Sequence, residues 1–143
     1  MVSIVLDTIV VSELMRSQPE QAVMDWFARR TGDIFYVSAI TRAEIMLGIS
    51  LLPAGKRRDS LASAADGMFS QDFAGRCLPF DAAGAAHYAA VVSGRRRTGQ
   101  AISTEDALIA AIALAHGYPL ATRNTKDFLS ISGLTLYNPW QTC

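Results

Sequence analysis

The hydrophobic residues of this chain form two kinds of segment. Residues 2–6 make a short apolar run without polar alternation, as expected for a strand that is buried on both faces of a parallel sheet. Residues 104–116 have a helical pattern that is apolar on nearly every side, which is typical of a helix enclosed by the rest of the protein. Each segment meets an acid at one end, Asp7 or Asp106. A carboxylate beside a buried segment needs a physical explanation.

Strand-like and helix-like segments alternate along the whole chain. Helices are expected directly after the first strand and at residues 19–32, 41–51, 56–73, 81–99, 104–116 and 125–129. This alternation predicts an α/β fold with a central parallel sheet of four or five strands flanked by helices. The length predicts that residues 1–143 form a single domain. The strands themselves are expected at residues 2–6, 34–37, 76–80, 118–122 and 134–137.

Capping residues mark two of the predicted helices. Asp81 is expected to cap a long helix that ends near Gly94 or Gly99. Gly117 is expected to end the buried helix, which places His116 at the negative end of the helix dipole. His116 is therefore interpreted as a residue that stabilises the helix end and not as a ligand.

Composition and charge narrow the functional classes. Half of the residues are hydrophobic and 18% are charged, so the chain is expected to fold around a large core. The 13 basic and 13 acidic residues balance, so only a local patch would attract a nucleic acid. The basic runs at residues 56–58 and 95–97 are the candidates, although solvated helix faces are the simpler interpretation.

Nothing in the sequence predicts a membrane helix or a secretory signal. The longest apolar stretch, residues 107–115, is shorter than the roughly 20 residues that span a bilayer. No basic residue precedes the apolar run at the N-terminus. We therefore expect a cytoplasmic protein with no membrane partner. Cys77 and Cys143 have no metal-binding spacing and are expected to stay reduced and without a role.

Acidic and polar residues follow the predicted strands. Asp7 ends the first strand, Glu44 lies in the helix after the second, and Asp106 opens the buried helix. Asn124 and Asp127 follow the strand at residues 118–122. The carboxyl ends of parallel strands meet at one edge of a sheet, so these side chains are expected to converge. Converging carboxylates repel one another unless they bind a hard cation such as Mg²⁺ or Mn²⁺, which predicts a metal-dependent site.

Two of these acids also have a purely structural interpretation. Thr41 with Glu44, and Ser103 with Asp106, have the three-residue offset of a capping box. Asp7 has no such offset, and its burial favours a functional role.

The last two polar residues also have structural alternatives. Asp127 fits a helix-surface acid as well as a site acid, and Asn124 fits a helix cap. Other chemistries lack their residues, because the chain has no phosphate-binding glycine motif, no serine nucleophile motif and no zinc cluster.

Four short motifs together resemble a known family. They are VLDTIVVSEL near the start, TRAEIMLGI in the second segment, and STEDALIAAIA and LATRNTKDF near the end. The chain is similar to the PIN-domain ribonucleases, and in particular to the VapC toxins of bacterial toxin–antitoxin pairs and the related FitB group. The resemblance covers nearly the whole chain and implies a PIN-like fold.

The resemblance also implies a function and partners. Asp7, Glu44 and Asp106 take the family's metal-binding positions, for Mg²⁺ or Mn²⁺, and Asp127 is favoured over Asn124 as a fourth catalytic acid. The family cleaves RNA, forms homodimers and is silenced by a protein antitoxin whose tail reaches the acidic groove. Contact with DNA is expected only through that antitoxin.

The residues beside the acids carry further implications and one departure. Thr122 and Arg123 match a hydroxyl and a basic position, where they would orient a water and a phosphate, or serve simply as a strand-end hydroxyl and a surface arginine. Ile9 stands where the family usually has Asn. Either a polar contact to Asp7 is lost and activity is weakened, or Ile9 packs into the core.

Two alternatives to an active ribonuclease stay open. One is a catalytically weak or inactive dimer that only binds its antitoxin on DNA, which the departures at Ile9 and Asn124 suggest. Another is a receiver-like phosphoacceptor domain, which also places an aspartate at a strand end. That class would need a second acid adjacent to the first near the N-terminus and a lysine after the last strand, and neither is evident.

Overall fold

The computed structural model describes residues 1–141 and contains one parallel sheet of five strands. The strand order is β3-β2-β1-β4-β5, with Val5 of the central strand opposite Tyr36 on one side and Leu120 on the other. This confirms the predicted α/β fold. Receiver-like domains have the order 2-1-3-4-5, so that alternative is wrong. The strands are β1 (Ser3–Leu6), β2 (Ile34–Ser38), β3 (Cys77–Leu78), β4 (Leu120–Ala121) and β5 (Leu136–Tyr137).

Helices occur in every segment where they are predicted, with small shifts at their ends. The third helix starts two residues early because Ser38, and not Thr41, is its cap. The helix predicted at residues 56–73 ends at Gly67 and continues as a π-helix, Met68–Asp72. The α-helices are α1 (Thr8–Leu14), α2 (Gln21–Ala28), α3 (Ala39–Ser50), α4 (Lys56–Gly67), α5 (Ala82–Arg97), α6 (Thr104–His116) and α7 (Thr125–Phe128).

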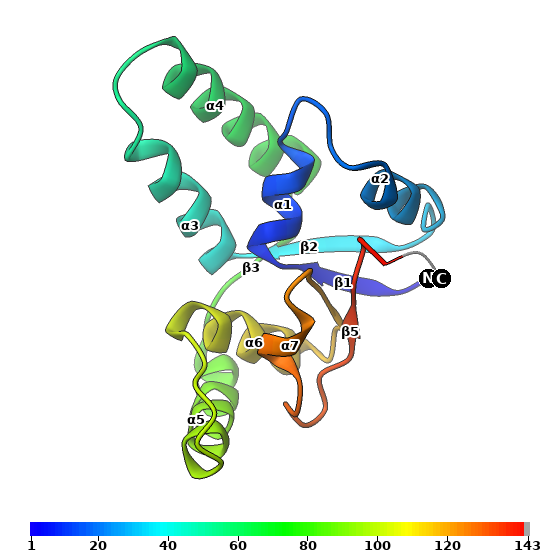
Figure 1. Ribbon diagram of the computed structural model, residues 1–143, viewed down its shortest axis with the longest axis vertical. Helices are drawn as coiled ribbons and strands as arrows, with labels where there is room; N and C mark the ends of the chain where they lie inside the picture. Colours follow the sequence, from blue (N-terminus) through cyan, green and yellow to red (C-terminus); the bar gives the residue numbers. More distant parts are fainter. Residues whose placement is uncertain (142–143) are drawn as a thin grey trace.

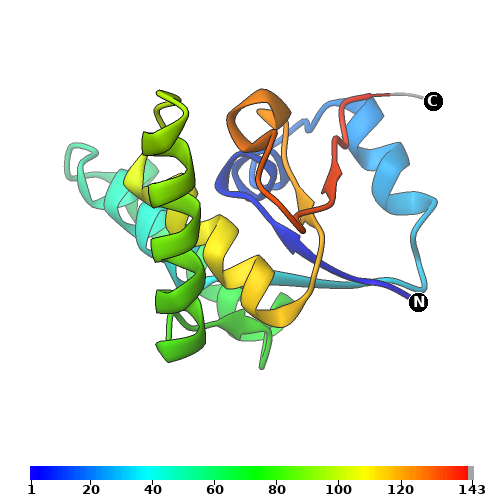
Figure 2. The same ribbon diagram turned by 90° about the horizontal axis from the view of Figure 1, so that it is seen from below.

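Helices cover both faces of the sheet, as Figures 1 and 2 show. The alternating side chains of β1 divide the core in two. Ile4 and Leu6 join the cluster beneath α1, α2 and α3, which also contains Trp26 and Phe69. Val5 faces the other way and packs with residues of α6 and with Phe128. A strand with both faces covered explains why residues 2–6 show no polar alternation.

The predicted enclosure of α6 is confirmed. Its residues 109–113 have no exposed surface, and α5 packs along its outer side. Gly117 ends the helix with φ 69°, a left-handed conformation that favours glycine. The Nδ1 atom of His116 lies 3.0 Å from the Ile112 carbonyl oxygen. His116 therefore interacts with the end of its own helix, as expected.

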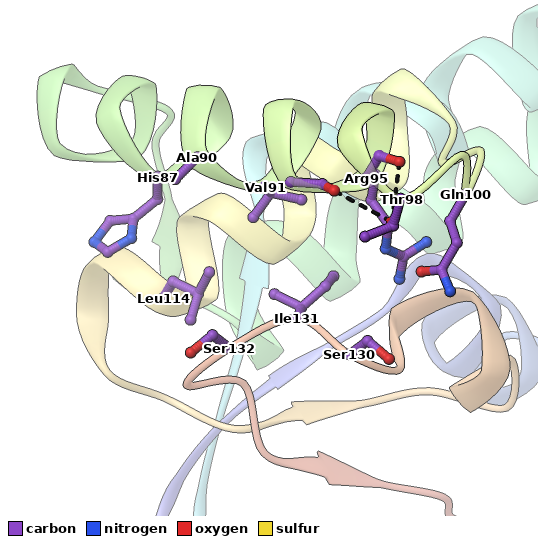
Figure 3. A pocket seen from close by; sticks show the side chains of 11 residues that line it. His87, Ala90, Val91, Arg95, Thr98, Gln100, Leu114, Ser130, Ile131 and Ser132 are labelled. Atoms are coloured by element: carbon purple, nitrogen blue, oxygen red, sulfur yellow. Dashed lines mark hydrogen bonds between the residues drawn. The ribbon is translucent and has the colours of Figure 1, made fainter.

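The basic run at residues 95–97 is only partly a solvated helix face. Arg96 and Arg97 are exposed, but Arg95 is 7% exposed. Figure 3 shows its guanidinium group directed from α5 toward the loop that carries Ser130. The solvated interpretation is thus wrong for Arg95, because its side chain bonds backbone carbonyl groups of other segments.

Three further expectations concern the cysteines and the membrane. Cys77 is a free, half-buried thiol, and Cys143 lies outside the described residues. Within residues 1–141, no helix has both the length and the apolar character that a membrane span requires.

Candidate active site

The candidate site lies at the carboxyl edge of the sheet, where β1 and β2 lead into α1 and α3 (Figure 1). Asp7 separates β1 from α1, and Glu44 lies in the second turn of α3. Asp106 is in the first turn of α6, and Asp127 follows β4 in α7. The charges of Asp106 and Glu44 act on Asp7, and those of Asp127 and Glu44 act on Asp106. The fold thus brings the four predicted acids into one electrostatic neighbourhood.

Asp7 is the most deeply buried of these acids, at 5% exposure. Its Oδ1 atom accepts a hydrogen bond from the Thr8 amide at 2.9 Å, and Oδ2 accepts one from the Thr122 hydroxyl at 2.7 Å. Burial outweighs both bonds and raises the pKa of Asp7 from 3.8 to about 6, with smaller contributions from Asp106 and Glu44. Asp7 lacks the three-residue offset of a capping box, but its side chain still caps α1 by accepting the very next amide, a structural role that the sequence did not reveal.

Glu44 is held by a chain of hydroxyl groups, and the predicted capping box with Thr41 does not form. Ser38 caps α3 by accepting the Thr41 amide at 3.1 Å, because β2 runs directly into the helix. The Thr8 hydroxyl donates to Glu44 Oε1 at 2.6 Å and lies 2.9 Å from the Thr41 hydroxyl. Since a hydroxyl has a single proton, Thr41 donates in the second bond. Thr8 therefore fixes Glu44 relative to Asp7.

Asp106 lies in the capped first turn of α6 and also belongs to the acid site. Its amide donates to the Ser103 hydroxyl at 3.1 Å, so Ser103 is the cap as predicted, but within residues 1–141 no bond from the Ser103 amide to the Asp106 carboxylate completes the capping box. Burial is the main cause that raises the pKa of Asp106, and the charges of Asp127, Glu44 and Glu105 add to it, while the Ser103 side chain acts in the opposite direction. A carboxyl group that served only as a cap would not lie beside these like charges.

The chemistry of these side chains fits a hard divalent cation. All four acids offer carboxylate oxygen, which Mg²⁺ and Mn²⁺ prefer. Burial and neighbouring charge raise the pKa of both Asp7 and Asp106, so a cation would relieve a repulsion that is already present. Among residues 1–141, no three His, Cys, Asp or Glu side chains stand close enough to hold one ion as they are placed. Water would complete the ligand set, as is usual for Mg²⁺.

Thr122 orients the Asp7 carboxylate and not a water. It is fully buried, its hydroxyl proton is committed to Asp7, and its oxygen accepts the Asn124 amide at 3.0 Å. Asn124 is exposed and stands at the cap position of α7, but its side chain makes no cap bond. Asp127 is half-buried and raises the pKa of Asp106. Of these two alternative residues, only Asp127 adds negative charge to the site.

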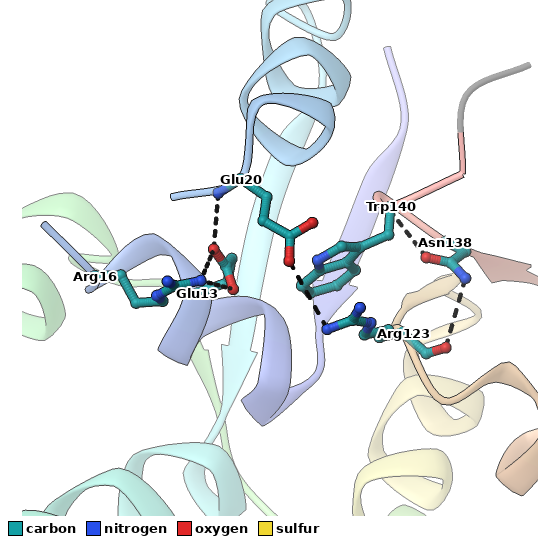
Figure 4. Close-up of polar contacts among 6 residues, drawn as sticks. All are labelled: Glu13, Arg16, Glu20, Arg123, Asn138 and Trp140. Atoms are coloured by element: carbon teal, nitrogen blue, oxygen red, sulfur yellow. Dashed lines mark hydrogen bonds and ion pairs between the residues drawn. The ribbon is translucent and has the colours of Figure 1, made fainter. Parts of the chain in front are cut away.

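Arg123 is held at the edge of the site by contacts that the sequence does not reveal (Figure 4). Its guanidinium group lies 5.1 Å from the centre of the Trp140 ring and 4.0 Å from Glu20. The Glu20 amide donates to the buried Glu13, which also pairs with Arg16 at 3.0 Å. The amide is the main cause that lowers the pKa of Glu13. Sequence reasoning missed these partners, because they lie far from the acid motifs.

Ile9 is partly buried and packs against the core cluster beneath α1. Its neighbour Thr8 supplies the amide that Asp7 accepts and the hydroxyl that Glu44 accepts. The contacts therefore favour the interpretation of Ile9 as a packing residue, because the polar role near the first acid is already filled by Thr8.

The arrangement agrees with a comparison of the sequence with known families. Residues 4–134 match the PIN domain. The chain belongs to the PIN-domain family. This PIN domain is 41% identical over 138 residues to VapC ribonuclease Y4jK of Sinorhizobium fredii, with 96% of this chain and 98% of that protein covered. It is 40% identical over 137 residues to toxin FitB of Neisseria gonorrhoeae, again with 96% and 98% covered.

A solved structure supports the same assignment. The structure of FitAB bound to an IR36 DNA fragment superposes on this PIN domain with a TM-score of 0.87 at 39% identity. The match covers 98% of this chain and 97% of that chain. The resemblance inferred from four short motifs is therefore confirmed over nearly the full length.

Proposed function

We propose that residues 1–143 form a single PIN domain that is a Mg²⁺- or Mn²⁺-dependent endoribonuclease, the toxin of a toxin–antitoxin pair. The observation that carries this proposal is the buried Asp7 with Glu44, Asp106 and Asp127 around it at the carboxyl edge of the sheet. The relative named a VapC ribonuclease supports RNA as the substrate. We expect the enzyme to act in the cytoplasm.

The acids divide into two roles. Asp7, Glu44 and Asp106 would hold the ion in part through water, because no three carboxylates of residues 1–141 stand close enough to bind one ion directly, and Asp127 would complete the catalytic set. A bound Mg²⁺ or Mn²⁺ supplies positive charge that favours attack by water and offsets the charge of the phosphodiester. Thr122 keeps the Asp7 carboxylate oriented through its 2.7 Å hydrogen bond.

Arg123 lies next to this site in the sequence and in space. Its half-exposed guanidinium group, with 51% side-chain exposure, can exchange the distant Glu20 carboxylate for a substrate phosphate. The 4.0 Å separation from Glu20 is long for an ion pair, so little interaction energy is lost when Arg123 leaves Glu20.

We expect an antitoxin to bind beside the acids. A groove of about 590 Å³ lies between α1, α3 and α4, and Glu44 is part of its lining. Met15, Ile49 and Leu61 give the groove an apolar surface, and Arg57 adds a positive charge. An antitoxin segment in this groove would lie next to Glu44 and block access to the site. We also expect a homodimer, and contact with DNA only through the antitoxin.

The alternative of a catalytically silent dimer is less well supported. All four acid positions are filled, and Thr8 provides the polar contacts near Asp7 that Ile9 lacks. A silent dimer would have no reason to keep a buried carboxyl whose pKa is raised to about 6. Measured Mn²⁺ affinity separates the active ribonuclease from the silent dimer, because only the ribonuclease needs to bind the ion.

The direct test is cleavage of RNA by the purified chain. Freed of any antitoxin, it should cut a structured RNA in millimolar Mg²⁺ or Mn²⁺ and lose this activity in EDTA. Asp106→Asn should abolish cleavage, whereas Glu105→Gln, which removes an exposed acid next to it, should not. Cleavage that persists in EDTA, or that Asp106→Asn retains, contradicts the proposal.

A further inference from the structure

Arg95 is a buried charge that has no buried counter-charge. It lies in the last turn of α5 at 7% exposure. None of the ion pairs within residues 1–141 includes it, and its Nε atom has no hydrogen-bond partner in that part of the chain. Burying a cation and leaving a donor unpaired both disfavour folding. A favourable contribution to the free energy of folding therefore does not explain why an arginine is buried here.

The other two guanidinium nitrogens donate to backbone carbonyl groups outside α5, two of them far away in the sequence. Nη2 donates to the carbonyl oxygens of Asp127 at 2.9 Å and Leu129 at 2.8 Å. Nη1 donates to the carbonyl oxygen of Ala101 at 3.3 Å. Ala101 lies two residues before Ser103, the cap of the helix that carries Asp106. One side chain therefore joins α5 to both segments that carry the outer acids.

The segment around Asp127 has little local structure to hold it. Helix α7 has four residues and no side-chain cap, and so short a helix is not stable by its own hydrogen bonds. Ser130 follows with φ 68°, the one positive value at a residue other than glycine within the described part of the chain. Such a conformation persists only where surrounding contacts impose it. The two bonds from Arg95 go to the carbonyl groups of Asp127 and Leu129, just before this position, and supply such contacts together with the buried Phe128.

A cavity of about 330 Å³ lies beside Arg95, lined among others by His87, Leu114 and Ser132 (Figure 3). It is not a site for an anion on the unpaired nitrogen, because the Nε atom is enclosed and has no surface that a ligand in the cavity could reach. The bonds to the carbonyl groups are the function of this side chain.

We propose that Arg95 is a positioning residue of the acid site. It holds the segment of Asp127, and the residues that precede the helix of Asp106, beside the other acids of the site. This inference rests on the proposed function, because the acids must bind an ion for their separation to matter. It also accounts for a charge that is kept in the core without a counter-ion.

The experiment uses Arg95→Met, which keeps the bulk of the side chain but removes its donors. Arg96→Met is the matched control, because Arg96 is the exposed neighbour on the same helix. In metal-free protein, hydrogen exchange of residues 100–106 and 124–130 should be faster in Arg95→Met and unchanged in the control. Mn²⁺ affinity, measured by calorimetry, should fall by about 10-fold to 100-fold, the usual effect of losing a group that orients metal ligands. Arg95→Lys should lie between, since an ammonium lacks the planar fork.

The outcomes separate this inference from the proposed function. A wild-type chain that binds Mn²⁺ but cuts no RNA contradicts the ribonuclease proposal. The positioning role of Arg95 is still tested in that case, because the Mn²⁺ affinities of Arg95→Met and wild type can be compared. Arg95→Met with wild-type Mn²⁺ affinity overturns the positioning role, even if the protein melts at a lower temperature. Absence of Mn²⁺ binding by the wild type overturns both. If Arg95→Met does not fold, Arg95→Lys takes its place in the same two measurements.

Discussion

Asp7 stands at the end of a strand that is buried on both faces, whereas Asp127 stands in a four-residue helix between two short strands. Both carboxylate oxygens of Asp7 are held in place, because the Thr8 amide donates to one and the Thr122 hydroxyl donates to the other. The backbone of Asp127 accepts a hydrogen bond from Arg95, 32 positions away in the chain, and its neighbour Phe128 is buried in the core. One acid is held at the end of a core strand, and the other lies in a short helix that depends on Phe128 and on the long-range bonds from Arg95.

The difference shows two ways to build a site from carboxylates. A rigidly buried acid needs no further support, but burial raises its pKa and makes its charged form unfavourable. An acid in a very short, half-buried helix keeps more of its solvation, but its position depends on contacts with other segments. We expect substitutions around Asp7 to change the pKa of its carboxyl group. Substitutions around Asp127 should instead change the position of its side chain relative to the other acids.

Replacing the buried acid should have the largest effect. Asp7→Asn should reduce Mn²⁺-dependent RNA cleavage by more than about 100-fold, since the loss of a ligand exceeds that of a group which only supports one. The fold should tolerate the change, because the Asn oxygen still accepts the Thr8 amide and its nitrogen can donate to the Thr122 oxygen. Asp66→Asn, an exposed helical acid, is the matched control and should retain activity. If Asp7→Asn retained its activity, Asp7 would not be a metal-binding residue of the site.

The same variant should reveal the pKa of Asp7 through stability. A carboxyl whose pKa rises from 3.8 to about 6 on folding favours the folded state when protonated, and this contribution is lost as the pH rises through 6. The shift of about 2 units corresponds to about 3 kcal/mol. In EDTA, Asp7→Asn should therefore be more stable than wild type by up to about 3 kcal/mol at pH 7.5, and nearly equal to it at pH 4. Urea denaturation across this range measures the difference. A difference independent of pH would contradict the raised pKa.

Removing the hydroxyl that orients Asp7 should have the next largest effect. Thr122→Val keeps the shape of the side chain but loses the 2.7 Å bond, which lowers the pKa of Asp7. Its loss should raise that pKa further, move the acid limb of the cleavage profile to higher pH, and weaken Mn²⁺ binding at pH 7 by about 10-fold to 100-fold. Thr122→Ser retains the donor and should behave as wild type. Equal pH profiles for the two variants would show that the bond does not control Asp7.

The part of the site that belongs to the core could be predicted from the sequence. An apolar strand ending in Asp7, and a helix apolar on all sides that begins near Asp106, are local patterns, and the meeting of parallel strand ends at one edge then brings the acids together. The strands β3, β4 and β5 are shorter than predicted, two residues each, because they pair with their neighbours only over that length. Local patterns show where a strand is possible but not how far its partner extends.

Long-range contacts could not be predicted. Ser38 and Thr41 both carry a hydroxyl suitable for a helix cap, and only the end of β2 decides between them. Arg95 lies in a run of three arginines, which is typical of a solvated face, so nothing local distinguishes the one that is buried. Its partners are the carbonyl groups of Ala101, Asp127 and Leu129, and any residue has such a group.

The identity of the fourth site residue can be tested by pairing two substitutions. Asp127→Asn should weaken Mn²⁺ binding by about 10-fold, since it removes one of the charges that act on Asp106, and it should move the pKa of Asp106 back toward its ordinary value. Asn124→Ala removes an exposed side chain that makes no cap bond and should leave Mn²⁺ affinity unchanged. Calorimetric titration of both variants checks this. A greater loss in Asn124→Ala would assign the fourth position to Asn124.

The smallest effect on the site is expected at Ile9. If the missing Asn of the family weakens this enzyme, Ile9→Asn should tighten Mn²⁺ binding by about 10-fold to 100-fold. The contacts favour the opposite result, because Ile9 packs against the core and Thr8 already provides the hydroxyl and the amide beside Asp7 and Glu44. We therefore expect unchanged Mn²⁺ affinity and a loss of about 1 to 3 kcal/mol in the free energy of unfolding, since a buried amide would lack partners. Ile9→Val should lose less, as it removes only one methyl group. Tighter Mn²⁺ binding in Ile9→Asn would show that Thr8 does not compensate for the missing Asn. The part of the site around Asp7 would then lack a polar contact that the family usually has.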